Sequence, residues 1–265
     1  MRRRDRSAIG TTPQAERRQA ADGATRARMQ NAAMQPTLPA PPDWPRIAAD
    51  LDATGWATFP LLAPEACALL RSGYDQPIFR SRIVMARHGF GRGEYQYYAA
   101  PLPEPVAGLR AALYPPLAAV ANAWAARLGE PDRYPPSHAD FLARCHAAGQ
   151  TRPTPLLLRY GPGDYNCLHQ DIYGELAFPL QVAVLLSASG DDFTGGEFVL
   201  VEQRPRMQSR AEVVPLAQGE AVVFAVNRRP VAGTRGDHAV RLRHGVSRIR
   251  SGQRMTLGII FHDAA

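Results

Sequence analysis

The sequence predicts a mainly β fold, a jelly roll preceded by an α/β extension, and two observations lead to that prediction. From residue 156 onward, eight short apolar or alternating runs follow one another, and turn residues separate them. Before residue 156, helical spacing dominates instead. Because eight strands at such short intervals are typical of a sandwich or jelly roll, we expect them to form one core flanked by helices.

The expected strands are short, and most are bounded by glycine. Turn residues stand between them at Gly161-Pro162-Gly163, Gly195-Gly196 and Ser251-Gly252. The eight runs are 156–160, 165–169, 179–187, 197–202, 211–216, 221–226, 241–249 and 254–262.

Composition divides the chain into three parts. Residues 1–40 are rich in Arg and Ala, lack apolar periodicity and end in closely spaced prolines, which predicts a disordered basic tail and linker. Residues 41–155 are expected to form a helical and mixed part that packs on the core. Residues 156–265 are expected to form the β core itself.

Several elements are expected within the mixed part. Two stretches of helical spacing flank a short alternating run at 55–60, which predicts a helix, a strand and a second helix. Residues 105–127 have the spacing of a buried helix. We expect that helix to break at Tyr114-Pro115-Pro116, because proline lacks the backbone N–H of a helical hydrogen bond.

The chain of 265 residues has a net charge of +7, and all 31 of its basic residues are arginine. Eleven of them lie in 203–254, against only three acids, and eight lie in the tail. Basic segments attract anions, so nucleic acid is a candidate partner through these segments. A solvated arginine-rich edge is the alternative.

Three cysteines, Cys67, Cys145 and Cys167, occur without Cys-x-x-Cys spacing, which predicts neither disulfides nor a zinc site. No apolar run has the length of a membrane span, and no apolar stretch follows the basic start. We therefore expect a cytoplasmic protein without a membrane partner. The pattern leaves the oligomeric state open.

His169, Asp171 and His244 are the candidate metal ligands. His169 and Asp171 stand at the end of the second run, where a spacing of two puts both side chains on one face. His244 lies in the seventh run. Two imidazoles and one carboxylate leave open positions on a metal, an arrangement typical of non-haem Fe(II) oxygenases.

His238 competes with His244, because Arg248 follows His238 by ten residues just as Arg254 follows His244. The turn at Ser251-Gly252 favours His244, since it makes Arg254 the start of the eighth strand. His238 is then expected in the preceding loop. Cys167 shares a strand face with His169 and is interpreted as a packing residue near the metal. The remaining histidines are expected to be structural, namely His88, His138, His146 and His262.

Arg254 offers a charged fork to a carboxylate co-substrate. Together with the three metal-ligand candidates, it makes residues 156–263 resemble the Fe(II)/2-oxoglutarate-dependent dioxygenase superfamily, specifically its prolyl-4-hydroxylase-like branch. The turns at 194–197 and 214–219 are similar to turns of that family. The resemblance implies a double-stranded β-helix core in which the second and seventh strands neighbour each other, as do the first and eighth.

The resemblance also implies roles for individual residues. Fe(II) would be held by His169, Asp171 and His244, with no catalytic residue beyond this metal centre. Arg254 and Thr256 match the Arg-x-Ser/Thr pattern that binds 2-oxoglutarate, and Tyr160 matches a first-strand tyrosine that reaches the same carboxylate. Fe(II) is thus the implied cofactor, 2-oxoglutarate and O2 are the implied co-substrates, and ascorbate is a further candidate.

The implied reaction hydroxylates a C–H bond and releases succinate and CO2, but the substrate is open. A prolyl or other protein side chain, or a small molecule, is the first hypothesis. A nucleic-acid demethylase is the second; the basic segments support it, whereas the last strand lacks further arginines and Gly174 stands where an acid is usual. A binding module without turnover is the third, disfavoured because every ligand position is present.

Residues 80–98 interleave arginines and tyrosines among glycines. We interpret this segment as part of the substrate wall or a lid, with Arg87, Arg92, Tyr95 and Tyr97 as the candidate wall residues. The alternative is a strand and turn that cap the barrel.

Overall fold

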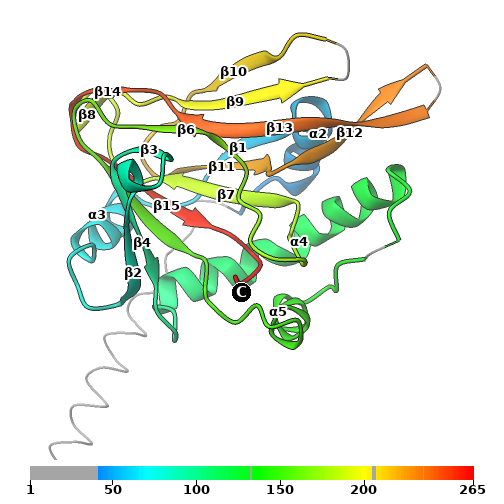
Figure 1. Ribbon diagram of the computed structural model, residues 1–265, viewed down its shortest axis with the longest axis horizontal. Coiled ribbons are helices and arrows are strands. Elements are labelled where there is room, and N and C mark those ends of the chain that lie inside the picture. The colour runs from blue at the N-terminus through cyan, green and yellow to red at the C-terminus, as the bar shows by residue number, and fades with distance from the viewer. Residues whose placement is uncertain (1–40, 132, 205–206, 235) are drawn as a thin grey trace, which may run out of the picture. The chain divides into compact units, whose positions relative to one another are not determined.

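A computed structural model describes residues 41–265 except 132, 205–206 and 235, so the expected tail of residues 1–40 lies outside the described part. Most of the described strands form two stacked sheets, and helices α4 (Glu104–Arg127) and α5 (His138–Ala147) lie beneath the larger one (Figure 1). Within these residues, no helix combines the length and apolar character needed to cross a membrane. The other described helices are α2 (Trp44–Thr54) and α3 (Pro64–Ser72), with a 3-10 turn η1 (Met85–Arg87).

The larger sheet is antiparallel throughout and combines strands from both parts of the chain. Its order is β1 (Trp56–Pro60), β11 (Glu220–Ala225), β7 (Leu180–Leu185), β15 (Arg254–Ile259), β5 (Leu156–Tyr160), β4 (Glu94–Tyr98) and β2 (Phe79–Val84). The strands before residue 156 thus extend the sheet of the core on both edges.

The smaller sheet faces the larger one and includes three strands from the basic segment at 203–254. Its order is β10 (Arg210–Val214), β9 (Phe198–Gln203), β13 (Gly236–Val246), β6 (Tyr165–His169) and β3 (Gly91–Arg92), with β12 (Arg228–Gly233) paired to β13. A separate ribbon joins β14 (Ile249–Gly252) and β8 (Phe193–Gly195). Each of the eight predicted runs contains a strand, which confirms the jelly-roll prediction.

The two faces of β7 show where the core lies. Val182 and Val184 join a buried cluster shared with the helices, whereas Ala183 joins a second cluster between the sheets that includes Phe198 and Phe224. All six residues of β7 are buried because both faces are covered. This explains why β7 reads as a continuous apolar run rather than as an alternation.

The predicted break in the helix at 105–127 is wrong, because α4 continues through Pro115 and Pro116. A proline ring fixes φ near the helical value, so a proline inside a helix costs only the missing backbone hydrogen bond and some local crowding. Leu113, Tyr114 and Leu117 are buried around the two prolines, and their packing keeps the turn helical.

Candidate active site

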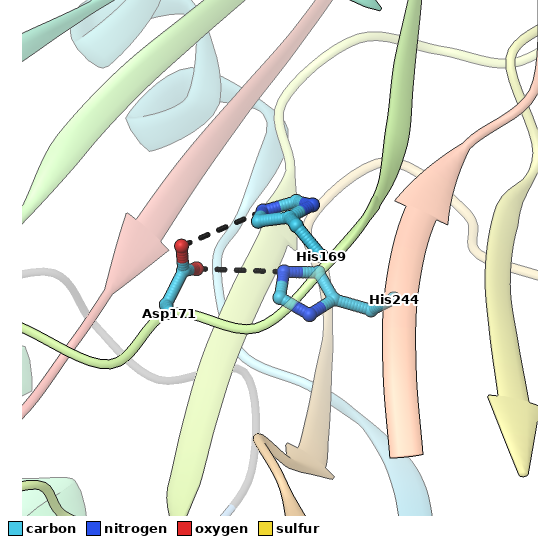
Figure 2. A group of neighbouring side chains, drawn as sticks. All are labelled: His169, Asp171 and His244. Carbon is cyan, nitrogen blue, oxygen red and sulfur yellow. Dashed lines mark ion pairs between the residues drawn. The ribbon is translucent and has the colours of Figure 1, made fainter. Parts of the chain in front are cut away.

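His169, Asp171 and His244 converge on one point between the sheets. Nε2 of His169 lies 3.4 Å from Oδ1 of Asp171, and Nε2 of His244 lies 3.4 Å from Oδ2 (Figure 2). One ligand atom from each residue lies within 4.8 Å of the others. These distances let a single ion contact all three side chains.

Strand pairing produces this convergence. His244 of β13 pairs directly with His169 of β6, so their rings lie on the same face with centroids 4.2 Å apart. Asp171 follows two residues after His169, just beyond the end of β6, and reaches the same point. The pairing that the resemblance implied for the second and seventh strands is therefore present.

Neighbouring groups orient the three side chains. Nδ1 of His169 donates to the backbone oxygen of Cys167 at 2.8 Å, which leaves Nε2 free for a metal. The hydroxyl of Tyr173 donates to Oδ1 of Asp171 at 2.6 Å. That contact engages one carboxylate oxygen and leaves lone pairs on the other for an ion.

The protonation states of Asp171 and His244 suit metal binding. Burial opposes charge on Asp171, but hydrogen bonds from His169 and His244 prevail and hold the pKa of Asp171 well below its usual range. Burial lowers the pKa of His244, and the charge of His169 adds to that effect. A charged carboxylate and a neutral imidazole are the forms that coordinate metal ions. Burial opposes charge on His169, but the hydrogen bond and charge of Asp171 raise the pKa of His169, so a metal ion would displace a proton from that ring.

The three residues line a cavity of about 320 Å³. Its walls include the aromatic rings of Tyr95, Phe198 and Phe224 and several aliphatic side chains. Arg254, Thr256 and Tyr160, the residues predicted to bind the co-substrate, line the same cavity. A metal site and a cationic group thus share one mostly apolar enclosure, the usual character of a small-molecule site.

Arg254 is buried and forms no salt bridge with any described acid. Its Nη1 donates to Oγ1 of Thr256 at 2.6 Å, while its Nε has no partner among the described residues. Tyr160 stands opposite Arg254 in the strand register, and its buried hydroxyl also has no partner there. Burial lowers the pKa of Arg254 to about 10, which still leaves the guanidinium charged at neutral pH.

A buried charge without a counter-ion is costly, and natural sites retain one where a ligand supplies the opposite charge. The unpaired groups of Arg254 and Tyr160 are donors, so the ligand they suit is an anion with oxygen acceptors. A carboxylate matches the fork of a guanidinium.

Of the four residues predicted to form a substrate wall, only Tyr95 lines the cavity. Tyr97 packs edge-on against Tyr95 and Tyr173 behind that wall. Arg87 and Arg92 are exposed, because they lie in η1 and on the outer strand β3. The segment 80–98 consists mainly of strands and turns, as in the alternative interpretation, and its loop brings Gly89 and Phe90 to the cavity.

Two further positions differ from expectation. His238 lies within β13 and not in a loop, but it is exposed in the hairpin with β12, six residues from His244. At the rise of a strand that separation is about 20 Å. Cys167 is exposed rather than packed, although it lines the cavity, and its backbone oxygen accepts a hydrogen bond from Nδ1 of His169.

Three cavity residues escaped sequence reasoning. Tyr173 carries a weak signal, since it follows Asp171 by two residues, but Gln181 looks like one polar residue in an apolar strand. Phe90 is 48% exposed beside the cavity. Only the pairing of distant strands brings these side chains together with the metal-ligand candidates.

A jelly roll that holds two imidazoles and one carboxylate in an apolar cavity belongs to the class of non-haem metal oxygenases. Comparison by sequence agrees. Residues 93–264 match a family described as "Oxygenase, catalysing oxidative methylation of damaged DNA". The chain belongs to this oxygenase family and is an oxidoreductase.

Relatives and solved structures were also found. Two uncharacterized proteins from two strains of Mycobacterium tuberculosis are each 54% identical over 195 residues, which cover 72% of this chain and 84% of theirs. A prolyl-4-hydroxylase from Pseudomonas putida is 16% identical, with a TM-score of 0.47 over 84% of this chain and 100% of that one. An oxidoreductase of the 2OG-Fe(II) oxygenase family from Burkholderia pseudomallei is 16% identical, with a TM-score of 0.49 over 85% of this chain and 95% of that one. The family assignment rests on the sequence match.

Proposed function

We propose that the protein is an Fe(II)- and 2-oxoglutarate-dependent dioxygenase that removes alkyl groups from damaged nucleic acid. The observation that carries the proposal is the pairing of two features in one cavity: the group His169, Asp171 and His244, and the buried Arg254 without an acidic partner. The first feature suits a metal with open positions, and the second suits an anionic co-substrate beside it.

The donor set fits Fe(II), since it offers two imidazole nitrogens and a carboxylate, with the sulfur of Cys167 exposed and outside the group. His169, Asp171 and His244 would hold the ion. Bound Fe(II) supplies oxygen activation, coupled to the conversion of 2-oxoglutarate to succinate and CO2. The chain itself orients Asp171 through Tyr173 and shields the centre with apolar side chains.

Arg254, Thr256 and Tyr160 are assigned to the distal carboxylate of 2-oxoglutarate. Nη1 of Arg254 and the Thr256 hydroxyl already lie together at 2.6 Å, and the Tyr160 hydroxyl remains free to donate. A guanidinium binds a carboxylate with two parallel hydrogen bonds, which fixes orientation as well as affinity. A co-substrate held in this way would share the cavity with the metal group.

The family description favours nucleic acid over the protein or small-molecule substrate that sequence analysis placed first. The cavity opening is compatible with that substrate. Phe90 and Leu168 line the cavity while 48% and 44% exposed, so they present apolar surface at its mouth. Exposed Arg87 and Arg92 flank Phe90 in sequence. Aromatic surface for bases beside cations for phosphates is the usual composition of a single-strand binding site.

The product distinguishes the two substrate classes. Hydroxylation of a methyl group on a ring nitrogen gives an N–CH2–OH group, which loses formaldehyde and leaves the nitrogen with a proton. Hydroxylation of a prolyl carbon leaves the oxygen on the product and releases no aldehyde.

The proposal is tested by loading the protein with Fe(II) and 2-oxoglutarate and supplying methylated single-stranded DNA, the unmodified strand or a proline-rich peptide. We expect succinate and formaldehyde in equal amounts with methylated DNA alone. His169→Ala should abolish both products, and the matched exchange His238→Ala should leave them unchanged. Succinate stimulated only by the peptide, without formaldehyde, would overturn the nucleic-acid assignment; turnover that survives in His169→Ala would overturn the metal assignment.

A further inference from the structure

Gln150 connects the part of the chain before the β core to the loop between Asp171 and β7. Its side chain is buried, at 2% exposed. Its Nε2 donates to the carbonyls of Tyr173 and Leu176, at 3.0 Å each, and to that of Asp263 at 2.7 Å. Its Oε1 accepts the backbone N–H of Leu176 at 2.9 Å. One buried amide therefore holds the loop at two residues and ties it to the segment after β15.

The backbone of Gln150 is itself fixed. Its N–H donates to the carbonyl of Cys145 in α5 at 2.9 Å. Phe141 and Cys145 of α5 belong to the buried cluster that also contains residues of α4 and of the larger sheet. Because a packed helix holds its backbone, Gln150 presents a pre-organised hydrogen-bonding group to the loop.

Gly174 lets the loop approach the Gln150 amide closely. Its φ is +107°, and a Cβ there would lie 2.5 Å from Cδ of Gln150. Glycine is the residue that fits both this backbone conformation and this contact. A side chain at Gly174 would push the loop away from the amide.

The loop carries Tyr173, which contacts a candidate metal ligand. Gln150 holds the Tyr173 carbonyl, and the Tyr173 hydroxyl donates to Oδ1 of Asp171 at 2.6 Å. The Tyr173 ring packs edge-on against Tyr97, with centroids 6.4 Å apart. Gln150 is not among the described residues that line the cavity. Its contacts reach the metal group only through the loop and Tyr173.

We propose that Gln150 is a positioning residue for the metal centre: it fixes the loop so that Tyr173 holds the Asp171 carboxylate in the orientation that a metal ion requires. This inference rests on the metal assignment within the proposed function and not on the choice of substrate. Ligand side chains bind a metal more tightly when surrounding groups fix their orientation in advance. The part of the chain before residue 156 therefore completes the active site as well as covering the larger sheet.

The test measures binding of Co(II) to the metal-free, full-length protein by calorimetry, with the visible absorption of the bound ion as a readout of ligand geometry. Gln150→Met removes the amide at similar volume. It should weaken Co(II) binding by about tenfold and change the absorption, because groups that orient metal ligands contribute about 10- to 100-fold to affinity.

Gln218→Met is the matched control for loss of a glutamine. Gln218 also donates to a backbone carbonyl, that of Leu186, and neither residue is among the described residues that line the cavity. Co(II) affinity in this variant should stay within about twofold of wild type. Melting temperatures of both variants show how much each exchange affects folding.

A double-mutant cycle shows whether Gln150 acts through Tyr173. Tyr173→Phe removes the hydroxyl and should itself weaken Co(II) binding by about tenfold or more. Adding Gln150→Met to Tyr173→Phe should then weaken binding by less than about twofold, because the contact that connects Gln150 to Asp171 is already lost. Two full, additive losses would overturn the proposed route through Tyr173.

Gly174→Ala tests the same contact from the loop, so the proposal stays testable if Gln150→Met does not fold. The added methyl displaces the loop from the amide and should weaken Co(II) binding by about tenfold. Gly236→Ala is its control, because Gly236 has a similar φ of +103° but nothing within 4 Å of an added Cβ. It should leave Co(II) affinity unchanged.

The outcomes separate this inference from the proposed function. If Gln150→Met and Gly174→Ala bind Co(II) as tightly as wild type and with the same absorption, Gln150 serves folding alone, and only this inference fails. The same holds if Gln218→Met or Gly236→Ala weakens binding equally. If wild type binds no Co(II), the metal assignment of the proposed function fails together with this inference.

Discussion

Arg254 has opposite effects on stability and on function. Its burial lowers the stability of the protein without co-substrate, and its charge is proposed to bind that co-substrate. Its guanidinium is buried without an acidic partner, a cost to the protein without co-substrate. We predict that Arg254→Met raises the KM for 2-oxoglutarate by about 100-fold, and Arg254→Lys by about tenfold, since lysine keeps the charge but loses the planar fork. Steady-state succinate formation measures both values.

Neither substitution of Arg254 should disturb the candidate metal ligands. Fe(II) affinity, measured by calorimetry, is expected to stay within about twofold of wild type in both variants. Without co-substrate, Arg254→Met should melt at the same temperature as wild type or higher, because it removes a buried charge that no salt bridge pairs. An unchanged KM, or a lower melting temperature with unchanged KM, would show that Arg254 is structural.

Residues differed in how far the sequence revealed them. The grouping of His169, Asp171 and His244 could be expected, because strand spacing and one turn fix their faces and order. The co-substrate role of Arg254 stays a prediction. The contact between Asp171 and Tyr173 depends on side-chain geometry, and the neighbourhood of Gln181 depends on the register of β7 with β11. Pairing between distant strands is a tertiary property, and local pattern does not encode it.

At the scale of elements, the strands with a strong apolar pattern were predictable and the short ones were not. Each of the eight runs contains a strand, whereas β8, β12 and β14 went unnoticed. β12 carries Arg228, Arg229 and Pro230, so its composition argues against a strand. Its pairing with β13 and the buried ion pair between Arg229 and Glu202 hold it in place.

Gly219, in the turn before β11, permits a close approach that an alanine would prevent. Its φ is +81°, and a Cβ there would lie 2.0 Å from the carbonyl oxygen of Leu62. The Gly219 carbonyl accepts hydrogen bonds from the backbone N–H groups of Leu61 and Leu62, which ties the chain after β1 to the turn. Gly219→Ala is predicted to lower the free energy of unfolding by about 3 kcal/mol.

Gly149 is the matched control, because it has the same φ of +81° but nothing within 4 Å of its added Cβ. Gly149→Ala should cost only about 1 kcal/mol, the left-handed backbone penalty by itself. Urea unfolding of both variants gives the difference, which isolates the steric contact with Leu62. Equal losses in the two variants would contradict the role given to this close approach.

At the scale of the whole described molecule, the part before residue 156 belongs to the same sheets as the core. β1, β2 and β4 extend the larger sheet, and β3 extends the smaller one. The sequence indicated these elements but not that they join the sheets of the core, since the pattern of a strand does not specify the strand with which it pairs. The arrangement has a functional consequence, because the loop before β3 supplies Phe90 to the cavity.

Two buried imidazoles link the folding of the whole molecule to pH. Nε2 of His138 donates to the carbonyl of Phe261 at 2.9 Å, and Nδ1 of His262 accepts from the backbone N–H of Phe178 at 3.2 Å. Burial lowers the pKa of each ring to about 4, and the positive charge of Arg110 contributes. In the unfolded chain both rings titrate near pH 6.5.

The sign of the effect follows from proton uptake. Below about pH 6.5 the two imidazoles bind protons in the unfolded chain but stay neutral in the native protein. The free energy of unfolding therefore falls as the pH drops from about 6.5 to about 4. Each ring should remove about 2 kcal/mol by pH 5 relative to pH 7. Urea unfolding at a series of pH values should show this loss in wild type and a shallower one in His138→Gln.

His88→Gln, which changes an exposed ring and keeps both buried ones, is the control. If wild-type stability stayed level from pH 7 to pH 5, or if His138→Gln kept the full slope, the neutral buried imidazole would not be the origin of acid sensitivity.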